Sequence, residues 1–523
     1  MNHPVVGIDL GTTNSVVASV SDRGEVVVLP NATGGNITPS VVYFEPDGSV
    51  VVGDEAIQAT AADPDHGVQL IKRNMGAELP LTIRGQDHTP ESISALILRQ
   101  LAAAVPAGTG PVRAVITVPA YFGLAEREAT HQAGLIAGLD VLDLLDEPVA
   151  AAAHYGLTTA GNRTVLVYDL GGGTFDTTVL EISGGEVRVL ATDGHHALGG
   201  ADVDRRVLDL VLQRLENVLP PGDLDEITED KRRHGDLVLD VEAAKRELSA
   251  RVSRPVVVHT RSGRSTITLT RADMDAICGD LFDTTADIIE RVLAEARARG
   301  LQAIDDVIMV GGSSRIPVLA GRLKSMLGQT PRLVEPDLAV AKGAALRAHH
   351  LAGTPQLAAI GRVPGRAAAA AGIGHVTPVT PRAIGVQIED SYDPAGERSF
   401  VEHLIEANTP LPAEQSSERF GTIMPGQEAV RIRVYEQAGP ARSAEIVHNR
   451  LVLDGELTGI GSPGARSVIR VTMRIAVDGR LTVIAHEPES GRELLLEAFV
   501  AGVVDDAETE RLTRLVGLTA VRG

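Results

Sequence analysis

The sequence is poor in several residue types, and each shortage excludes a class of protein. It has one cysteine, no tryptophan and 2% aromatic residues in 523 positions. A single cysteine, Cys278, cannot form an intrachain disulfide, which fits a reducing compartment, and we expect it to be a small buried apolar residue. No run approaches the ~18 apolar residues of a membrane-spanning helix, and no targeting segment precedes the first expected strand, at Val5. We therefore expect a cytoplasmic protein without a membrane partner.

Positive charge is also scarce, because Lys and Arg total 48 against 69 for Asp and Glu, a net charge of −21. Such an acidic chain repels phosphate backbones, and no basic stripe offsets the total. We therefore do not expect nucleic acid as the main partner. The length and the 44% hydrophobic content allow two or three domains, each with its own core.

Residues 1–352 alternate strand-like and helix-like segments, which predicts an α/β domain. Residues 165–168 and 307–310 are apolar on both faces and predict buried strands. Thr89 is followed by Pro90, the pattern of a capped helix start. The pattern ends at residues 353–378, a stretch rich in Ala, Gly and Pro that predicts a linker.

Residues 379–500 change to a period of two, which predicts an antiparallel β domain. Val430, Ile432 and Val434 alternate with polar or small neighbours, and Asp478-Gly479 predicts a hairpin turn. Residues 501–523 predict one short helix and a tail. Its start is Asp505 or Asp506, its end is Gly517, and its apolar stripe is Leu512, Leu515 and Val516. A helix of ~12 residues is not stable alone, so we expect it to dock on another part of the chain.

An internal repeat carries the most information about function. Residues 5–20 and 167–182 both consist of an apolar strand, Asp-Leu-Gly, a small polar turn and a second strand. Turns rich in Gly and Thr let N–H groups and hydroxyls approach phosphate oxygens, and Asp9 and Asp169 could hold a hydrated Mg²⁺ beside them. An ordinary hairpin explains one copy but not Asp-Leu-Gly twice. Two facing turns would hold a triphosphate from both sides, without the Gly-x4-Gly-Lys-Ser/Thr of a P-loop.

A third element, residues 309–317, is a strand that runs into two glycines and a helix start. Glycines there would let a flat adenine lie against the backbone, and Arg315 could stack on it. With these three elements, residues 4–505 resemble the seventy-kilodalton heat-shock chaperone family. The resemblance implies an actin-like two-lobed ATPase domain followed by an antiparallel β-sandwich that binds extended apolar peptides. It also implies ATP or ADP, Mg²⁺ and K⁺ as ligands.

The resemblance also implies roles for individual residues. Those expected to act in ATP hydrolysis are Lys72, Glu147, Asp169, Thr174 and Asp176. Those expected around Mg²⁺, largely through water, are Asp9, Asp169 and Glu147. Those expected to contact nucleotide are Gly11, Thr12, Thr13, Asn14, Gly171, Gly172, Gly173, Gly199, Gly200, Glu242, Lys245, Arg246, Ser249, Gly311, Gly312, Ser313, Arg315 and Asp337. Those expected to contact peptide are Phe420, Val430 and Ile432.

The sparing use of lysine supports two of these assignments independently. The chain uses Arg almost everywhere, yet Lys72 and Lys245 are lysines. A compact ammonium acts as a point charge on phosphate, which a guanidinium does not replace equivalently.

The sequence departs from the family in ways that concern coupling and partners. The linker is rich in alanine where the family has leucines, and one short helix is expected where the family has a long lid. Asp143 stands where the family has an Arg that meets the J-domain cochaperone. Unfolded polypeptides are the expected clients, with a J-domain cochaperone and a nucleotide exchange factor as further partners. We expect weak coupling between ATP and peptide binding.

Two alternatives use the same fold. A small-molecule kinase would need an acceptor pocket between the lobes and gives no reason for the β domain. An ATP-binding scaffold or regulatory protein with little turnover would fit the altered linker. The histidine pairs at 195–196 and 349–350 have no ligand at convincing metal-binding spacing, and we interpret them as solvated or capping residues.

Overall fold

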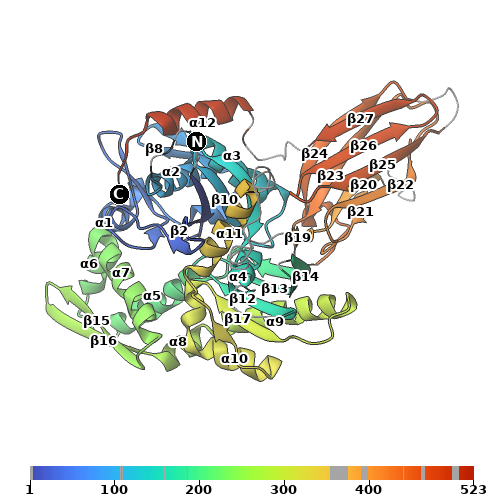
Figure 1. Ribbon diagram of the computed structural model, residues 1–523. Helices are drawn as coiled ribbons and strands as arrows, with labels where there is room; N and C mark the ends of the chain where they lie inside the picture. The colour runs from blue at the N-terminus through green and yellow to red at the C-terminus, as the bar shows by residue number, and fades with distance from the viewer. Residues whose placement is uncertain are drawn as a thin grey trace.

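The computed structural model describes residues 4–106, 108, 110–156, 161–184, 186–353, 375–389, 398–439, 441–460, 466–497, 504 and 506–522. A two-lobed α/β body carries a β domain at one side (Figure 1). This arrangement confirms the predicted fold class, an actin-like domain followed by an antiparallel β-sandwich.

The first lobe is built on a sheet with the N-terminal strand in its middle. Its main strands are β1 (Val5–Asp9), β2 (Asn14–Val20), β3 (Val26–Val28), β10 (Arg113–Val118) and β11 (Asp140–Asp146). β1 runs antiparallel to β2 and parallel to β10. α2 (Pro90–Ala103) and α3 (Leu124–Ile136) pack together beside this sheet. The cap predicted at Thr89 is confirmed, since its side chain accepts a hydrogen bond from the Ser92 N–H.

The second lobe repeats this pattern. Its strands are β12 (Arg163–Leu170), β13 (Phe175–Ser183), β14 (Glu186–His195), β17 (Asp306–Val310), β18 (Arg332–Leu333) and β19 (His375–Thr377). β12 runs antiparallel to β13 and parallel to β17, as β1 does with β2 and β10. The two predicted buried strands, β12 and β17, are confirmed. α4 (Glu147–Gly156) and α11 (Ala339–Gly353) pack between the two sheets in one apolar cluster.

Smaller units extend each lobe along the cleft. In the first lobe these are β4 (Thr38–Pro39), β5 (Val42–Phe44), β6 (Val50–Val52), β7 (Gly67–Val68), β8 (Leu81–Ile83), β9 (Gln86–His88), α1 (Asp54–Ala62) and the 3-10 turns η1 (Pro64–His66) and η2 (Ile71–Asn74). In the second they are α5 (Gly200–Glu216), α6 (Asp223–Glu229), α7 (Lys231–Leu248), α8 (Arg271–Ile277), α9 (Gly279–Ala298), α10 (Pro317–Leu327), η3 (Gly312–Arg315), β15 (Ser253–Thr260) and β16 (Gly263–Thr270). α1 meets α7 so closely that a Cβ on Gly235 would overlap the Ala61 backbone. The two lobes therefore touch across the cleft.

The β domain is a sandwich of two four-stranded antiparallel sheets. One holds β20 (Ile384–Glu389), β21 (Ser399–Ile405), β23 (Ala429–Gln437) and β24 (Asn449–Thr458). The other holds β22 (Ala413–Gly421), β25 (Val468–Ile475), β26 (Leu481–Glu487) and β27 (Arg492–Glu497). The hairpin predicted at Asp478-Gly479 joins β25 to β26, with Gly479 at φ +86°. A short 3-10 turn, η5 (Ile446–His448), precedes β24.

The predicted C-terminal helix is present and docks on the first lobe. α12 (Asp506–Leu518) crosses α2 and α3 (Figure 1), and Leu512 and Val516 are buried in the core of that lobe. A final strand, β28 (Val521–Arg522), runs parallel to β6. The expectation that Gly517 ends the helix was wrong, because α12 continues to Leu518. A glycine inside a helix costs only about 1 kcal/mol, which the docked face offsets.

The end of the predicted linker lies against the second lobe. Residues 375–377 form β19, which pairs in parallel with β14 at the edge of the sheet. Residues 354–374, including the alanine-rich stretch, lie outside the described residues.

Candidate functional site

The two Asp-Leu-Gly turns face each other across the cleft. The first follows β1, and the second joins β12 to β13. A Cβ on Gly172 would overlap the side chain of Thr13, and a Cβ on Gly173 would overlap that of Thr12. Only glycine allows this approach, so the turns bring backbone N–H groups and threonine hydroxyls together at one place. Such a concave cluster of N–H groups is typical of phosphate sites.

Acidic side chains converge behind the turns. Asp9 ends β1, Asp169 lies near the end of β12, Asp176 lies near the start of β13, and Glu147 begins α4. Burial, followed by the charge of Glu147, raises the pKa of Asp9 to about 7. Burial also raises the pKa values of Asp169 and Asp176, again with Glu147 as the next cause. Buried carboxylates that repel one another favour a bound cation, which restores the charged form.

Lys72 is the cation in this cluster. It comes from η2, is only 4% exposed, and its Nζ donates to Glu147 Oε1 at 2.5 Å. Asp176 Oδ2 is buried without a hydrogen-bond partner among the described residues. One ammonium thus faces several carboxylates, and the donor set fits a hydrated divalent cation. Nowhere in the described part of the chain do three His, Cys, Asp or Glu side chains lie close enough to hold an ion directly.

The start of α5 supports the second turn. Gly200 N donates to Gly171 O at 3.0 Å, and Ala201 N donates to Gly172 O at 2.8 Å. This close approach also explains the predicted glycines at 199 and 200. A Cβ on Gly199 would collide with the second turn, and a Cβ on Gly200 would collide with Ser313.

The predicted adenosine residues come from α7, η3 and the loop before α11. Lys245 Nζ donates to Gly200 O at 3.1 Å and pairs with Asp204 at 2.5 Å. Gly311 has φ +79°, and a Cβ there would overlap Asp169 and Leu170. The remaining predicted residues lie on the same elements or directly after α7: Glu242, Arg246, Ser249, Gly312, Ser313, Arg315 and Asp337.

Two further ion pairs join the other charged members of this group. Arg315, which could stack on adenine, pairs with Asp337 at 2.5 Å, and Arg246 pairs with Glu242. Arg315 remains half-exposed beside the two glycines. Its guanidinium is therefore accessible at the place where the adenine is expected.

The three predicted peptide-binding residues lie at one end of the sandwich core. Phe420 is on β22, while Val430 and Ile432 are on β23 in the facing sheet. Phe420 and Val430 are half-buried, and Ile432 is buried within the core. The loop between these strands exposes two large apolar side chains, Ile423 and Met424, which the sequence reasoning missed. Their signal was an apolar pair beside the turn formers Pro425 and Gly426.

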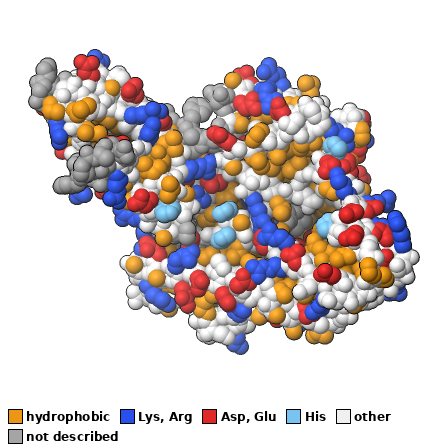
Figure 2. All heavy atoms as spheres, turned by 180° about the vertical axis from the view of Figure 1, so that it is seen from behind, with side chains coloured by type: hydrophobic (Ala, Val, Ile, Leu, Met, Phe, Trp, Pro, Cys, Tyr) orange, Lys and Arg blue, Asp and Glu red, His pale blue; other side chains and the backbone are white. Residues whose placement is uncertain are grey.

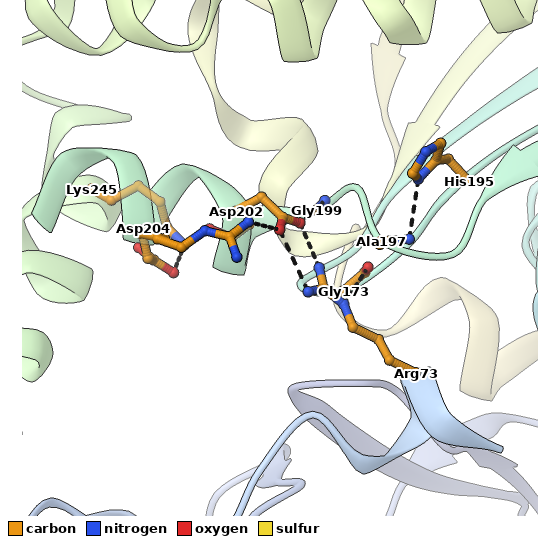
Figure 3. Close-up of polar contacts among 10 residues, drawn as sticks. Arg73, Gly173, His195, Ala197, Gly199, Asp202, Asp204 and Lys245 are labelled. Carbon is orange, nitrogen blue, oxygen red and sulfur yellow. Dashed lines mark hydrogen bonds and ion pairs between the residues drawn. The ribbon is translucent and has the colours of Figure 1, made fainter. Parts of the chain in front are cut away.

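Sequence reasoning also missed Arg73 and Asp202. Arg73 reaches from η2 to the second turn and to Asp202 on α5 (Figure 3). The available signal was the position of Arg73 directly after Lys72. Asp143, singled out as a departure, accepts a hydrogen bond from Arg347 Nε at 2.9 Å.

Comparison with known proteins decides the family. The family model described as Hsp70 protein matches residues 5–81 and 77–516. Chaperone protein DnaK of Thermotoga neapolitana is 39% identical over 502 residues, covering 94% of this chain and 79% of the relative. Chaperone protein DnaK of Thermosipho melanesiensis is 36% identical over 525 residues, covering 96% and 83%. The chain belongs to the Hsp70 family.

This Hsp70 is therefore an ATP-dependent molecular chaperone and an ATPase, which binds ATP and ADP and acts on unfolded polypeptides. Nothing in its fold or its relatives favours the alternative of a scaffold with little turnover. Among the described residues, no helix is long and apolar enough to cross a membrane. On the face drawn in Figure 2, basic side chains are interspersed with acidic ones.

Proposed function

We propose that this Hsp70 hydrolyses ATP between its two facing turns and uses the cycle to bind and release extended apolar segments in its β domain. The observation that carries the proposal is the Lys72–Glu147 pair, which is buried beside Asp9, Asp169 and Asp176. A buried cation next to carboxylates and facing Gly-rich turns suits the charge that develops on a transferred phosphoryl group.

The proposed hydrolysis assigns a separate task to each group. The N–H groups and hydroxyls of the turns, including those of Thr13 and Thr174, hold the phosphates. Lys72 stabilises charge on the γ-phosphoryl group, and Glu147 orients the water that attacks it. A bound Mg²⁺ would supply positive charge at the phosphates, and Asp9 and Asp169 would hold it largely through water. Asp176 would face a K⁺ ion.

The proposed peptide site is the end of the sandwich that carries Phe420 and Val430. An extended segment there would gain affinity from main-chain hydrogen bonds and specificity from an apolar pocket. Ile432 would form the floor of that pocket from within the core. In this proposal the protein binds its clients, a J-domain cochaperone and a nucleotide exchange factor in the cytoplasm.

ATP turnover with and without an unfolded polypeptide tests this function. We expect measurable basal turnover that rises modestly with polypeptide, and a Val430→Phe variant whose basal turnover is unchanged but which no longer binds a leucine-rich peptide. Val447→Phe is the matched control, because Val447 is exposed on η5, away from the proposed pocket. Peptide binding by Val430→Phe as tight as that of wild type would place the pocket elsewhere.

A further inference from the structure

Arg73 connects the first lobe to the phosphate turn of the second. It lies in η2, directly after Lys72, and its side chain is 17% exposed. Its Nε donates to the carbonyl oxygen of Gly173 at 2.9 Å, and its Nη2 pairs with Asp202 Oδ2 at 2.5 Å (Figure 3). Charge-assisted bonds of this kind are roughly twice as strong as neutral ones and fix geometry as well as distance.

Asp202 links Arg73 to α5, the helix that supports the second phosphate turn. It is 5% exposed, and its Oδ2 also accepts the N–H of Gly199 at 2.9 Å, at the start of α5. The first turn of α5 in turn donates to Gly171 O and Gly172 O. The guanidinium of Arg73 therefore ties together η2, the second phosphate turn and the start of α5.

Lys72 and Arg73 are neighbours in sequence but bond to different lobes. Lys72 bonds Glu147, which directly follows β11 of the first lobe. Arg73 bonds Gly173 and Asp202, which both belong to the second lobe. A change in the angle between the lobes would leave the Lys72 bond in place and break the Arg73 bonds.

We propose that Arg73 is a positioning residue, which sets the second phosphate turn in register with Lys72 only when the cleft is closed. Hydrolysis then depends on closure, because the phosphate held by the second turn meets the ammonium of Lys72 in one arrangement of the lobes. This inference rests on the proposed site of hydrolysis and adds the device that aligns its two halves.

A second contact across the cleft provides a matched control. Lys231, at the start of α7, pairs with Asp65 of η1, and both side chains are exposed at the rim. This pair also joins the two lobes, but neither residue touches a phosphate turn. Its loss should change how easily the cleft opens without changing the register of the turns.

The test compares Arg73→Ala, Arg73→Lys and Asp202→Asn with Lys231→Ala. Single-turnover hydrolysis of pre-bound ATP and the nucleotide off-rate are measured separately for each variant. For Arg73→Ala we expect a single-turnover rate reduced at least tenfold, with a smaller change in off-rate, as expected for lost alignment rather than lost binding. Lys231→Ala should show the reverse, a faster off-rate with a much smaller loss of hydrolysis than Arg73→Ala, because the register of the turns is kept when the cleft is closed.

The conservative variants separate positioning from structural support. Arg73→Lys keeps the charge but can make only one of the two contacts, so we expect partial recovery of hydrolysis. Asp202→Asn keeps an acceptor for Gly199 N and weakens the Arg73 pair, so it should lose hydrolysis in the same sense as Arg73→Ala. Asp202→Asn also provides the test if Arg73→Ala does not fold.

Two results would overturn the inference. One is a wild-type single-turnover rate in both Arg73→Ala and Asp202→Asn. The other is an equal loss of hydrolysis in Lys231→Ala, which would assign the effect to closure in general. Lys72→Ala, measured in parallel, distinguishes this failure from failure of the proposed hydrolytic site, since only the latter leaves Lys72→Ala active.

Discussion

The ATPase domain and the β domain place their charges in opposite ways. In the ATPase cleft, Lys72 and Glu147 are buried, and carboxylates with raised pKa values surround them. On the sandwich, Arg470 pairs with Glu418 and Arg474 with Glu414 on exposed strand faces. Exposed pairs of this kind contribute about 0–1 kcal/mol each.

The difference shows where each domain meets its ligand. The buried carboxylates of the cleft repel one another unless a bound cation, with the phosphates that accompany it, offsets their charge. Recognition of the ligand in the cleft must therefore depend mainly on charge. The sandwich offers apolar side chains at one end, among them Ile423 and Met424, and backbone groups of its strands. Recognition there must depend on shape and burial of apolar surface.

Lys72→Ala gives the largest expected effect and breaks the charge pattern of the cleft. Removing the ammonium leaves the carboxylates uncompensated and takes a positive charge from the γ-phosphoryl group. We expect single-turnover hydrolysis to fall ~10²-fold or more while ATP still binds. Lys324→Ala, which removes an exposed lysine from α10, is the control and should hydrolyse normally. Normal hydrolysis by Lys72→Ala would remove Lys72 from the mechanism.

The sequence predicted the two facing turns because the residues of each turn are close together in the sequence. Asp9 lies in the same short segment as Thr12 and Thr13, and Asp169 lies in the same segment as Thr174, so one strand and one turn carry each of the two facing motifs. The repeat then predicted that the halves face each other. Arg73 and Asp202 are 129 residues apart, and neither has a motif of its own, so only their contact in the fold reveals them.

The same reasoning explains the partial success with α12. The spacing of Leu512 and Val516 predicts an amphipathic helix that must dock. An apolar stripe does not indicate, however, which surface of the protein the helix packs against. Its partner surface on α2 and α3 lies about 400 residues earlier, as the bond from Arg99 Nη1 to Thr519 O illustrates. The prediction for Gly517 was wrong because a glycine ends a helix in this way only where its φ is positive. The φ of Gly517 is not positive.

Leu512→Ala tests whether the C-terminal helix is structurally part of the ATPase domain or of the β domain. Leu512 is fully buried in the core of the first lobe, although it follows the β domain in sequence. We expect the ATPase domain to lose about 2 kcal/mol of unfolding free energy, the lower end for a buried leucine, because α12 can move away and limit the cavity. Hydrogen exchange at α2 and α12, together with denaturant unfolding, measures the loss.

Leu518→Ala is the matched control, since Leu518 lies at the exposed end of the same helix. Its effect should stay within about 0.5 kcal/mol. Equal effects of the two variants would mean that α12 is not part of the ATPase core.

Asp9→Asn sharpens the assignment of charge recognition to the cleft. The variant keeps the shape of the side chain and the bond from Thr117 Oγ1 at 3.1 Å, but it removes one negative charge near the expected cation. We expect the Mg²⁺ concentration required for nucleotide binding to rise roughly tenfold, because hard cations prefer carboxylate oxygens. Titration of Mg²⁺ against a fluorescent nucleotide measures this. Asp22→Asn, at an exposed turn, should leave the titration unchanged.

The contact between the domains includes a short strand, a buried ion cluster, the packing of Ala125 into the apolar core of the sandwich, and a hydrogen bond from Thr192 N to Asn408 Oδ1 at 2.9 Å. β19 adds a single buried apolar side chain, Val376, to the second lobe. Glu436 Oε1 accepts the N–H of Leu124 at 3.0 Å, and Arg382 lies between Glu436 and Glu126. Burial raises the pKa of Glu436, with Arg382 acting against it. The attraction within such a cluster is largely offset by the cost of removing its charges from water.

The smallest expected effect is therefore that of nucleotide on peptide release. A ligand shifts a conformational equilibrium only by its differential affinity for the two states. β19 contributes little apolar surface and the ion cluster is nearly balanced, so we expect these two contacts to add little to the stability of the docked state. We expect fast peptide exchange in both nucleotide states, and less than a tenfold acceleration by ATP, which corresponds to about 1.4 kcal/mol. The off-rate of a fluorescent peptide with ATP and with ADP measures this, and Glu436→Gln should reduce the difference further. A much larger acceleration by ATP in the wild type would show that this contact, despite its composition, couples the two domains strongly.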